Sequence, residues 1–384
     1  MTSNRTAPEH PGGSVAGIGD FSLLVGAIAP PGTAAHQAWM ASGAVGASPA
    51  ALLALARSHG VVVQMARALV GGAFSDLREA FRKPARDRVL GALGQTAELS
   101  RVAGQFAGAG IPLIALKGPG LAQDIFGDPT ARDPGDLDLL IRFEDLPAAD
   151  RLLTGIGYGR DPGWSAALSD RDPNRMYGRV FNIGHLDYHH PTRGIVVEVH
   201  WRWFHVEEIV PFDGSLIWEG LRHVRIGSVA VPVLSPAVQL LYLSFHAAKH
   251  ECERLKWLND LSWLLMRLDD AVVGEAAAHA RRLGILNLFL APLLCAVELG
   301  ATRLPPSLAA LTDRQPVRRF AAHCRDRLVR SDPSAQAGLG QKYRRWRLYW
   351  RLASHLDRPR RLRLAARLIR VFLAALMRLC RIAE

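Results

Sequence analysis

Two aspartates, Asp136 and Asp138, stand one residue apart inside the apolar stretch "GDLDLLI". Residues at i and i+2 of a β-strand share a face, so both carboxylates are expected to project together while Leu137 and Leu139 fill the buried side. Neighbouring carboxylates repel each other, and burial without a partner adds to the cost. Mg²⁺ removes that cost because it takes oxygen ligands. The spacing is also common at the solvent edge of strands, so a metal site and a solvated pair are both open.

A glycine-rich turn, "LKGPG", precedes these aspartates and supplies Lys117, Gly118 and Gly120. Such a turn after a strand lets backbone N–H groups approach phosphate oxygens, and a lysine adds a point charge. The plain alternative is a strand-to-helix turn. Arg132, four residues before Asp136, is predicted to contact a phosphate or to pair with the aspartates, against the alternative of a surface arginine.

A third carboxylate, Glu198, lies in "GIVVEVHW", where Glu198 and His200 alternate with valines. A carboxylate flanked by valines needs a partner, and a metal held by the two aspartates would provide one. "HAAKHE" places His246 and His250 at i and i+4 of a helix. That spacing suits zinc, but the H-E-x-x-H pattern is absent, so core or hydrogen-bonded histidines are favoured. We treat His200, His246 and His250 as residues that line the cleft.

The segment "RLKWLNDLSWLL" is predicted to be an amphipathic helix. Its leucines and Trp257 form a core stripe, and Arg254, Lys256 and Asp260 are expected on the opposite, solvated face. The alternative is that Lys249 or Lys256 reaches a triphosphate.

The helices and strands that must position these residues are predicted from changes in composition and hydrophobic spacing along the chain. Short β-branched or leucine runs predict strands of a mixed sheet: "IPLIAL", "DLDLLI", "IVVEVHW" and "HVRIGSVAVPVL". "GHLDYHHP", with His185, His189 and His190, is expected to be a loop that either faces the substrate or is merely polar. Ala/Leu-rich segments such as "SPAALLALARSHGVVVQMARALVGG" and "SPAVQLLYLSFHAAKH" predict helices that begin at Ser-Pro. The expected parts are a disordered N-terminus (1–15), a helical region (16–110), an α/β core (111–235), a second helical domain (236–340) and a basic tail (341–384).

Several separated motifs occur in the order found in a known family. "LKGPGLAQDIFGDPTARDPGDLDLLI", "GIVVEVHW" and "LSPAVQLLYLSFHAAKHECERLKWLNDLSWLL" resemble the uncharacterised bacterial nucleotidyltransferase family of the polymerase-beta-like superfamily. Its pattern is an L-K-G turn, an R…D-x-D-L-L block, an E-L-H-W strand and a helix with spaced histidines. The resemblance covers about residues 111–265. Lys-Gly-Pro-Gly replaces the superfamily's usual Gly-Ser turn, so Lys117 is expected to replace the serine contact, and Val199 stands where leucine is usual.

The resemblance implies an α+β fold, with a small mixed β-sheet nucleotidyltransferase core flanked by N-terminal and C-terminal helical regions. It implies that the catalytic residues Asp136, Asp138 and Glu198 hold two Mg²⁺ ions, while the Lys117 turn and Arg132 bind the nucleotide. The expected reaction moves NMP, with AMP from ATP expected, to a small-molecule or peptide/protein acceptor and releases pyrophosphate. A peptide natural-product pathway is a family-level expectation. Kinase-like phosphoryl transfer and a non-catalytic nucleotide-binding or scaffold protein are the alternatives.

The basic character of the chain belongs to its tail. The net charge is +12, yet residues 341–384 alone carry twelve Arg and one Lys against Asp357 and Glu384. The net charge therefore does not indicate what residues 1–340 bind. Helical spacing predicts an amphipathic tail with an apolar side that includes Leu364 and a basic face formed by Arg363, Arg367, Arg370, Arg378 and Arg381. Internal packing or a partner protein is favoured for it over an anionic membrane surface, and nucleic acid is the least favoured.

Composition indicates a globular protein, with 49% hydrophobic and 21% charged residues. The sequence start lacks a signal-peptide pattern, and no apolar run approaches the ~20 residues of a spanning helix. We expect a cytoplasmic protein, with peripheral membrane association as an alternative through the tail. The four cysteines, Cys252, Cys295, Cys324 and Cys380, include no C-x-x-C pair, which argues against disulfides or a thiolate metal site.

Overall fold

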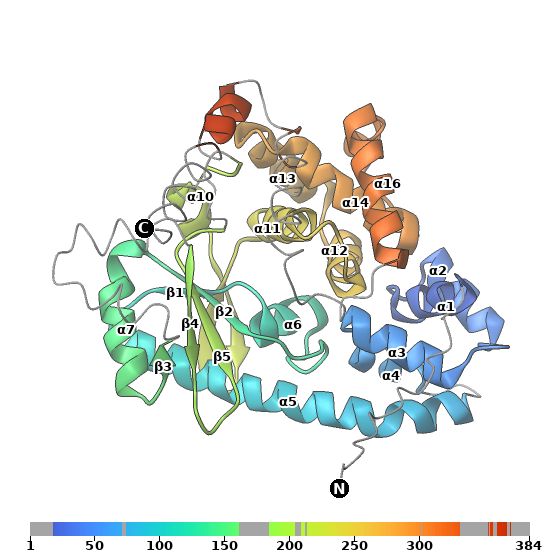
Figure 1. Cartoon of the computed structure of the whole chain (residues 1–384), viewed down its shortest axis with the longest axis horizontal. Coiled ribbons are helices and arrows are strands. Elements are labelled where there is room, and N and C mark those ends of the chain that lie inside the picture. The colour runs from blue at the N-terminus through green and yellow to red at the C-terminus, as the bar shows by residue number, and fades with distance from the viewer. Residues whose placement is uncertain are drawn as a thin grey trace, which may run out of the picture.

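The structure, a computed structural model, describes residues 18–70, 74–160, 184–203, 209–211, 213–300 and 302–330, together with 352, 354–355, 359–366 and 369. In this part of the chain a five-stranded sheet stands on one long helix, and most of the later helices lie on the other side of the sheet (Figure 1). The expected α+β fold with a small mixed sheet and flanking helical regions is confirmed. The predicted N-terminal segment 1–15 lies outside the described residues.

The first helical region packs along the end of α5. Its helices are α1 (Ile18–Ile28), α2 (Ala34–Ser42), α3 (Pro49–His59), α4 (Val62–Ala68) and α5 (Ser75–Gly108). The predicted Ser-Pro start is present in α3, where the Ser48 side chain accepts a hydrogen bond from Ala51 N–H. The stretch expected as a single helix is divided between α3 and α4, because Gly60 takes the left-handed conformation at φ 67°.

The central sheet has the strand order β1-β2-β5-β4-β3. Strands β2 and β5 run parallel, and the other neighbours are antiparallel. The strands are β1 (Leu113–Ala115), β2 (Leu137–Ile141), β3 (Gly159–Arg160), β4 (His185–His189) and β5 (Val196–His200). Three of them match predicted strands. The loop expected at "GHLDYHHP" is wrong, since these residues form β4 and pair with β5 along its whole length.

The two faces of this sheet have different surroundings. Leu137, Leu139, Val197 and Val199 are buried against α5 and α7 in one hydrophobic cluster. The opposite face carries Asp138 and Glu198 in directly opposed positions, and it faces α6 and α11. The alternation predicted from the sequence is therefore present, and it turns the carboxylates toward the helical side.

Short elements connect the strands, and a second hairpin follows the sheet. These are α6 (Gly118–Phe126), the 3₁₀ turn η1 (Phe143–Asp145), α7 (Leu146–Gly155), α10 (Gly214–Trp218), β6 (Arg222–Ile226) and β7 (Val229–Val233). The hairpin packs on β1, α5 and α6, so it supports the strand that leads into the Lys117 turn.

The later helices form a layered bundle with its own apolar core. They are α11 (Pro236–Lys249), α12 (Leu255–Arg267), α13 (Asp270–Arg282), α14 (Leu286–Gly300), α15 (Pro306–Thr312) and α16 (Gln315–Arg330). Helix α14 packs against α11, α12 and α16. Among the described residues, none of the helices combines the length and apolar character needed to cross a membrane.

The described part of the tail shows how its start docks. Residues 359–366 are helical, Leu364 is buried, and Arg363 is exposed, as the predicted amphipathic pattern requires. The Arg360 guanidinium donates to the carbonyl oxygen of Leu283. Most of the predicted basic face lies outside the described residues, so roles on a membrane or nucleic acid stay predictions.

Candidate active site

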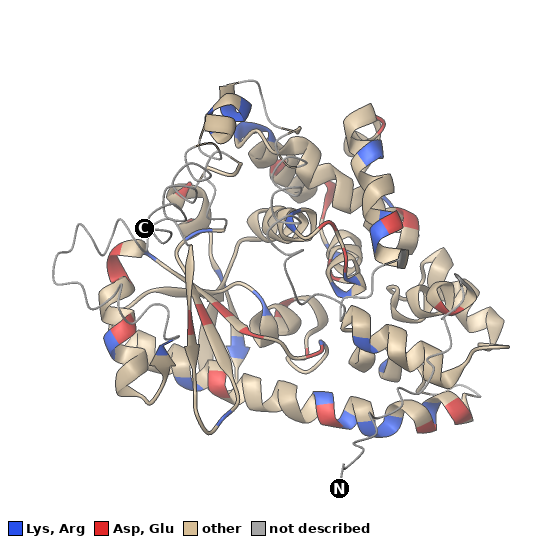
Figure 2. Ribbon diagram, viewed as in Figure 1, with Lys and Arg blue, Asp and Glu red and all other residues tan. Residues whose placement is uncertain are grey.

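The site is built on the register between the parallel strands β2 and β5. Asp138 lies directly opposite Glu198, so their side chains share the face that α11 covers. Ligand atoms of Asp138, Glu198 and His200 all lie within 4.8 Å of one another. Figure 2 shows acidic residues gathered on the central strands where these meet α6. The structure thus brings together two of the three predicted carboxylates from positions sixty residues apart.

Two basic side chains hold these carboxylates. Lys117 Nζ lies 2.6 Å from Asp138 Oδ1, and His200 Nε2 lies 3.3 Å from that oxygen and 3.1 Å from Glu198 Oε2. Burial of Asp138 favours its neutral form, but the charge of Lys117 and the His200 hydrogen bond prevail and lower its pKa. Burial likewise would lower the pKa of His200, yet its hydrogen bonds to Asp138 and Glu198 raise it. The buried negative charge is therefore compensated by Lys117 at Asp138 and by His200 at both Asp138 and Glu198.

Local backbone geometry explains how Lys117 reaches this position. Lys117 caps the start of α6, and Gly118, the next residue, has a left-handed φ of 68° that favours glycine. This turn brings the lysine side chain to Asp138 of β2. Gly120 has a different task, since a Cβ there would lie 2.9 Å from the Cβ of Ala115, and the missing side chain lets α6 pack on β1. Phosphate contacts by Gly118 and Gly120 stay predictions.

The third predicted carboxylate, Asp136, lies one residue before β2 and is exposed. The strand expected to contain both aspartates therefore begins at Leu137. Asp136 nevertheless lies close to the same group, since partial burial and then the negative charges of Glu198 and Asp138 raise its pKa. A raised carboxyl pKa among like charges is the electrostatic situation that a bound cation relieves.

Sequence reasoning missed Asp187 of β4 and expected His185 in a loop rather than on this strand. Asp187 is directly opposite Glu198, and His185 is directly opposite His200, so both share the carboxylate face. His185 Nε2 lies 3.7 Å from Asp187 Oδ1, and the His185 and His200 rings are 4.9 Å apart between centroids. The only signal for them was the alternation of His, Asp and His with apolar residues in "HLDYH".

Residues of α11 and α12 form the helical side of the site. The rings of His246, His250 and Trp257 contact one another, with centroid distances of 4.8 Å from His250 to His246, 4.9 Å from His250 to Trp257 and 5.2 Å from His246 to Trp257. Burial, and then the positive charge of Lys117, lowers the pKa of Lys249 to about 8, while Asp138 and Glu198 oppose that shift. Lys249 therefore lies within electrostatic reach of the carboxylates. The predicted solvated face of α12 is wrong at Asp260, which is completely buried.

Arg132 is bound to Asp260 rather than to the aspartates of β2. Its Nε and one terminal nitrogen donate to the two carboxylate oxygens at 2.9 Å and 2.7 Å. Both side chains are buried, so the surface-arginine alternative is wrong. Its contact with a phosphate stays a prediction, and the observed fork joins the segment after α6 to α12.

The donor set fits a hard divalent cation. Asp136, Asp138 and Glu198 offer carboxylate oxygens, the ligands that Mg²⁺ prefers, and His200 adds one imidazole nitrogen. Lys117 and His200 contact the same carboxylate oxygens that a cation would take. The residues present therefore suit such an ion.

Family comparison agrees with this geometry. A family model described as an uncharacterised nucleotidyltransferase matches residues 46–301, two thirds of the sequence. The chain belongs to this nucleotidyltransferase family. The match includes the Lys117 turn, all three carboxylates and α11 to α14, and it confirms the resemblance drawn from the motifs. A comparison with curated proteins gives no match. Family membership supports a transferase role with an NTP as substrate.

Proposed function

We propose that this nucleotidyltransferase moves an NMP group, AMP being the expected one, from an NTP to a small-molecule or peptide/protein acceptor and releases pyrophosphate in a Mg²⁺-dependent reaction. The observation that carries the proposal is the opposition of Asp138 and Glu198 across β2 and β5, with Asp136 near enough for their negative charges to raise its pKa. These three carboxylates would hold the cations. When bound, such cations stabilise charge on the attacking and leaving oxygens of phosphoryl transfer.

The chain's own basic groups supply the phosphate side of the site. Lys117 reaches Asp138 from the start of α6, so its Nζ is available to bind a phosphate oxygen beside that carboxylate. Lys249 adds positive charge from the helical side. Both lysines are proposed to contact the phosphates, with the backbone N–H groups at the start of α6 beside them.

Glu198 and His200 are proposed to act together on the acceptor side. A carboxylate oxygen of Glu198 accepts the proton of the acceptor hydroxyl or amine as it attacks the α-phosphorus. His200 donates a hydrogen bond to Glu198 and holds its orientation. The side chain of Glu198 is 24% exposed, so an acceptor can reach it, whereas Asp138 at 5% is shielded.

A labelling experiment tests this function. The purified protein is incubated with α-³²P-ATP or γ-³²P-ATP, Mg²⁺ and a cell extract, beside Asp138→Asn and the exposed control Asp270→Asn. We expect transfer of the α-label only, lost in Asp138→Asn and retained in Asp270→Asn. Transfer of the γ-label alone identifies a kinase and overturns the proposal. Absence of any transfer, with Mg·ATP bound equally well by wild type and Asp138→Asn, indicates a non-catalytic protein.

A further inference from the structure

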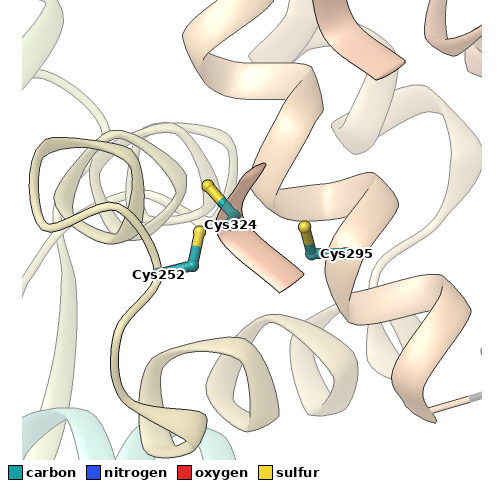
Figure 3. Close-up of side chains that lie close together, drawn as sticks. All are labelled: Cys252, Cys295 and Cys324. Atoms are coloured by element: carbon teal, nitrogen blue, oxygen red, sulfur yellow. The ribbon is translucent and has the colours of Figure 1, made fainter. Parts of the chain in front are cut away.

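Three cysteines that are far apart in the sequence meet inside the helical bundle. Cys252 lies in the turn after α11, Cys295 in α14 and Cys324 in α16. Their sulfur atoms all lie within 4.8 Å of one another (Figure 3). All three side chains are buried, and none forms a disulfide. The spacing of these cysteines in the sequence argued against a thiolate site, and only the packing of α14 against α11 and α16 creates the cluster.

The backbone at Cys252 is strained in a way that places its thiol. Glu251 and Cys252 have φ of 51° and 54°, in the left-handed region that favours glycine. Each such residue costs about 1–2 kcal/mol. The Cys252 N–H donates to the Ala247 carbonyl at 2.8 Å, which closes the turn. Glycine would fit this turn without strain, so the presence of a buried cysteine needs another explanation.

Ion pairs next to the cysteines fasten the turn to α16. Glu251 Oε1 lies 3.1 Å from His323 Nε2, and Glu253 Oε2 lies 3.1 Å from a terminal nitrogen of Arg327. Glu251 precedes Cys252 and His323 precedes Cys324, so these contacts fix the separation of the two thiols. On the third helix, Cys295 Sγ donates to the carbonyl of Ala321 in α16 at 3.3 Å. All three sulfurs are therefore held in place by neighbouring contacts.

The chemistry of the cluster is that of a soft-metal site. A cation about 2.3 Å from each sulfur sets the sulfurs about 3.8–4.0 Å apart, so the cluster needs to contract by less than about 1 Å. Burial raises the pKa of Cys252 and Cys324 well above the ordinary range, whereas the contacts of Cys295 with these two thiols lower its pKa. Metal coordination deprotonates such thiols and releases the protons to solvent. Among the described residues no His, Asp or Glu joins the group as a fourth ligand.

We propose that Cys252, Cys295 and Cys324 bind one soft d¹⁰ cation, Cu⁺ or Zn²⁺, each thiol losing its proton as its sulfur–metal bond forms. Three thiolates are the donors that such ions select. The bound cation would join the turn after α11 to α14 and α16, and it is separate from the carboxylate site. The proposal does not depend on the transferase reaction.

Metal titration of the full chain tests the proposal. The reduced, metal-stripped protein is titrated with Zn²⁺, and anaerobically with Cu⁺, against a chromophoric chelator. The variants are Cys252→Ser, Cys324→Ser and, as a thiol control outside the trio, Cys380→Ser. We expect one equivalent of at least one ion in wild type and in Cys380→Ser, and at least a tenfold weaker affinity in the two trio variants. The ion that wild type binds with the higher affinity, Zn²⁺ or Cu⁺, is the one that the site selects.

Three results would overturn the proposal: no stoichiometric binding of either ion by wild type, binding retained in Cys252→Ser, or binding lost equally in Cys380→Ser. Because a serine variant can misfold, each protein is also melted without metal and with saturating metal. A bound ion raises the melting temperature of wild type. The trio variants are expected to show no such rise even where their metal-free melting curves match wild type, and a rise equal to that of wild type counts against the site.

Discussion

Among the described residues, two clusters of metal-ligating side chains are present, and they differ in donor type, burial and compensating charge. Asp138, Glu198 and His200 lie on a sheet face reached from solvent through Glu198, and basic residues compensate their charge. The cysteine trio lies in the apolar bundle, and burial keeps two of its thiols neutral. Oxygen ligands with compensating cations suit a hard ion that is exchanged with substrate, whereas buried sulfur suits a soft ion that stays.

The two sites also differ in origin, one depending on strand geometry and the other on the packing of helices. The carboxylate site follows from strand alternation, because each ligand is placed by the local pleat and the β2–β5 register. The thiol cluster has no local pattern and exists only where three helical elements pack. Variants that change one cluster are therefore expected to leave the other cluster's readout intact.

The largest expected effect is on transfer activity in Asp138→Asn. Loss of a ligand carboxylate removes several kcal/mol of charge stabilisation in the transition state, so we expect activity to fall by at least about 10³-fold. Metal binding by the cysteine trio should be unchanged in the same variant. Single-turnover label transfer and the metal titration measure the two. A residual activity above one tenth of wild type would remove Asp138 from the catalytic set.

Breaking the buried pair between Arg132 and Asp260 should give the largest effect on stability. The pair joins the segment after α6 to α12, which packs on the cysteine-bearing α14. Arg132→Met leaves a buried carboxylate unpaired and should lower the free energy of unfolding by about 3–5 kcal/mol. Arg132→Met combined with Asp260→Leu should recover most of that loss, as measured by urea unfolding.

The double variant also tests the predicted phosphate contact of Arg132. If Arg132 acts only through Asp260, the KM for NTP in the stable double variant equals that of wild type. A KM raised about tenfold or more in that variant, with its fold intact, would show that Arg132 contacts the nucleotide.

The sequence predicted most of the carboxylate site but only part of what surrounds it. Asp138 and Glu198 alternate with buried residues in apolar strands, which is a signal a single sequence carries. The strand that bears His185 and Asp187 is polar, and pairing with β5 rather than propensity makes it a strand. Asp260 belongs to the polar side of a helical pattern, yet Arg132 from a distant segment allows its burial. Such partners are visible only in three dimensions.

Acid should destabilise the folded protein through buried histidines. Burial, assisted by the charge of Arg254, lowers the pKa of His59 from 6.5 to about 4. The unfolded chain then binds the proton first, so stability is complete above about pH 6.5 and falls as the pH drops to about 4. The maximum loss from this group is on the order of 3 kcal/mol.

Urea unfolding from pH 7 to pH 4 measures this loss. His185, His246 and His250 also have lowered pKa values and contribute with the same sign, so the difference between wild type and His59→Gln isolates His59. Gln can still accept the hydrogen bond from Leu255 N–H that His59 Nδ1 accepts at 3.4 Å. An equally steep decline in His59→Gln would show that His59 is not the group that titrates.

His200→Gln should reduce transfer activity less than Asp138→Asn does. His200 orients Asp138 and Glu198, and removing a group that orients metal ligands typically costs about 10–100-fold in activity or metal affinity. The Mg²⁺ concentration for half-maximal transfer should rise accordingly. His279→Gln, which removes a comparable His–Glu contact of 3.2 Å on α13, is the matched control and should change neither value. A normal Mg²⁺ requirement in His200→Gln would show that His200 does not orient the metal ligands.

The smallest expected effect concerns Cys252→Gly in the absence of metal. Removing the side chain leaves a small cavity, but glycine relieves about 1–2 kcal/mol of left-handed strain, so the net change in unfolding free energy should stay within about 1 kcal/mol. Cys295→Ala in α14 has no such strain to relieve and should lose more. If Cys252→Gly is the less stable of the two, the thiol contributes packing that outweighs its backbone strain. If Cys252→Gly is the more stable of the two, the left-handed turn does not stabilise the fold. Its role would then be to place the Cys252 sulfur beside those of Cys295 and Cys324.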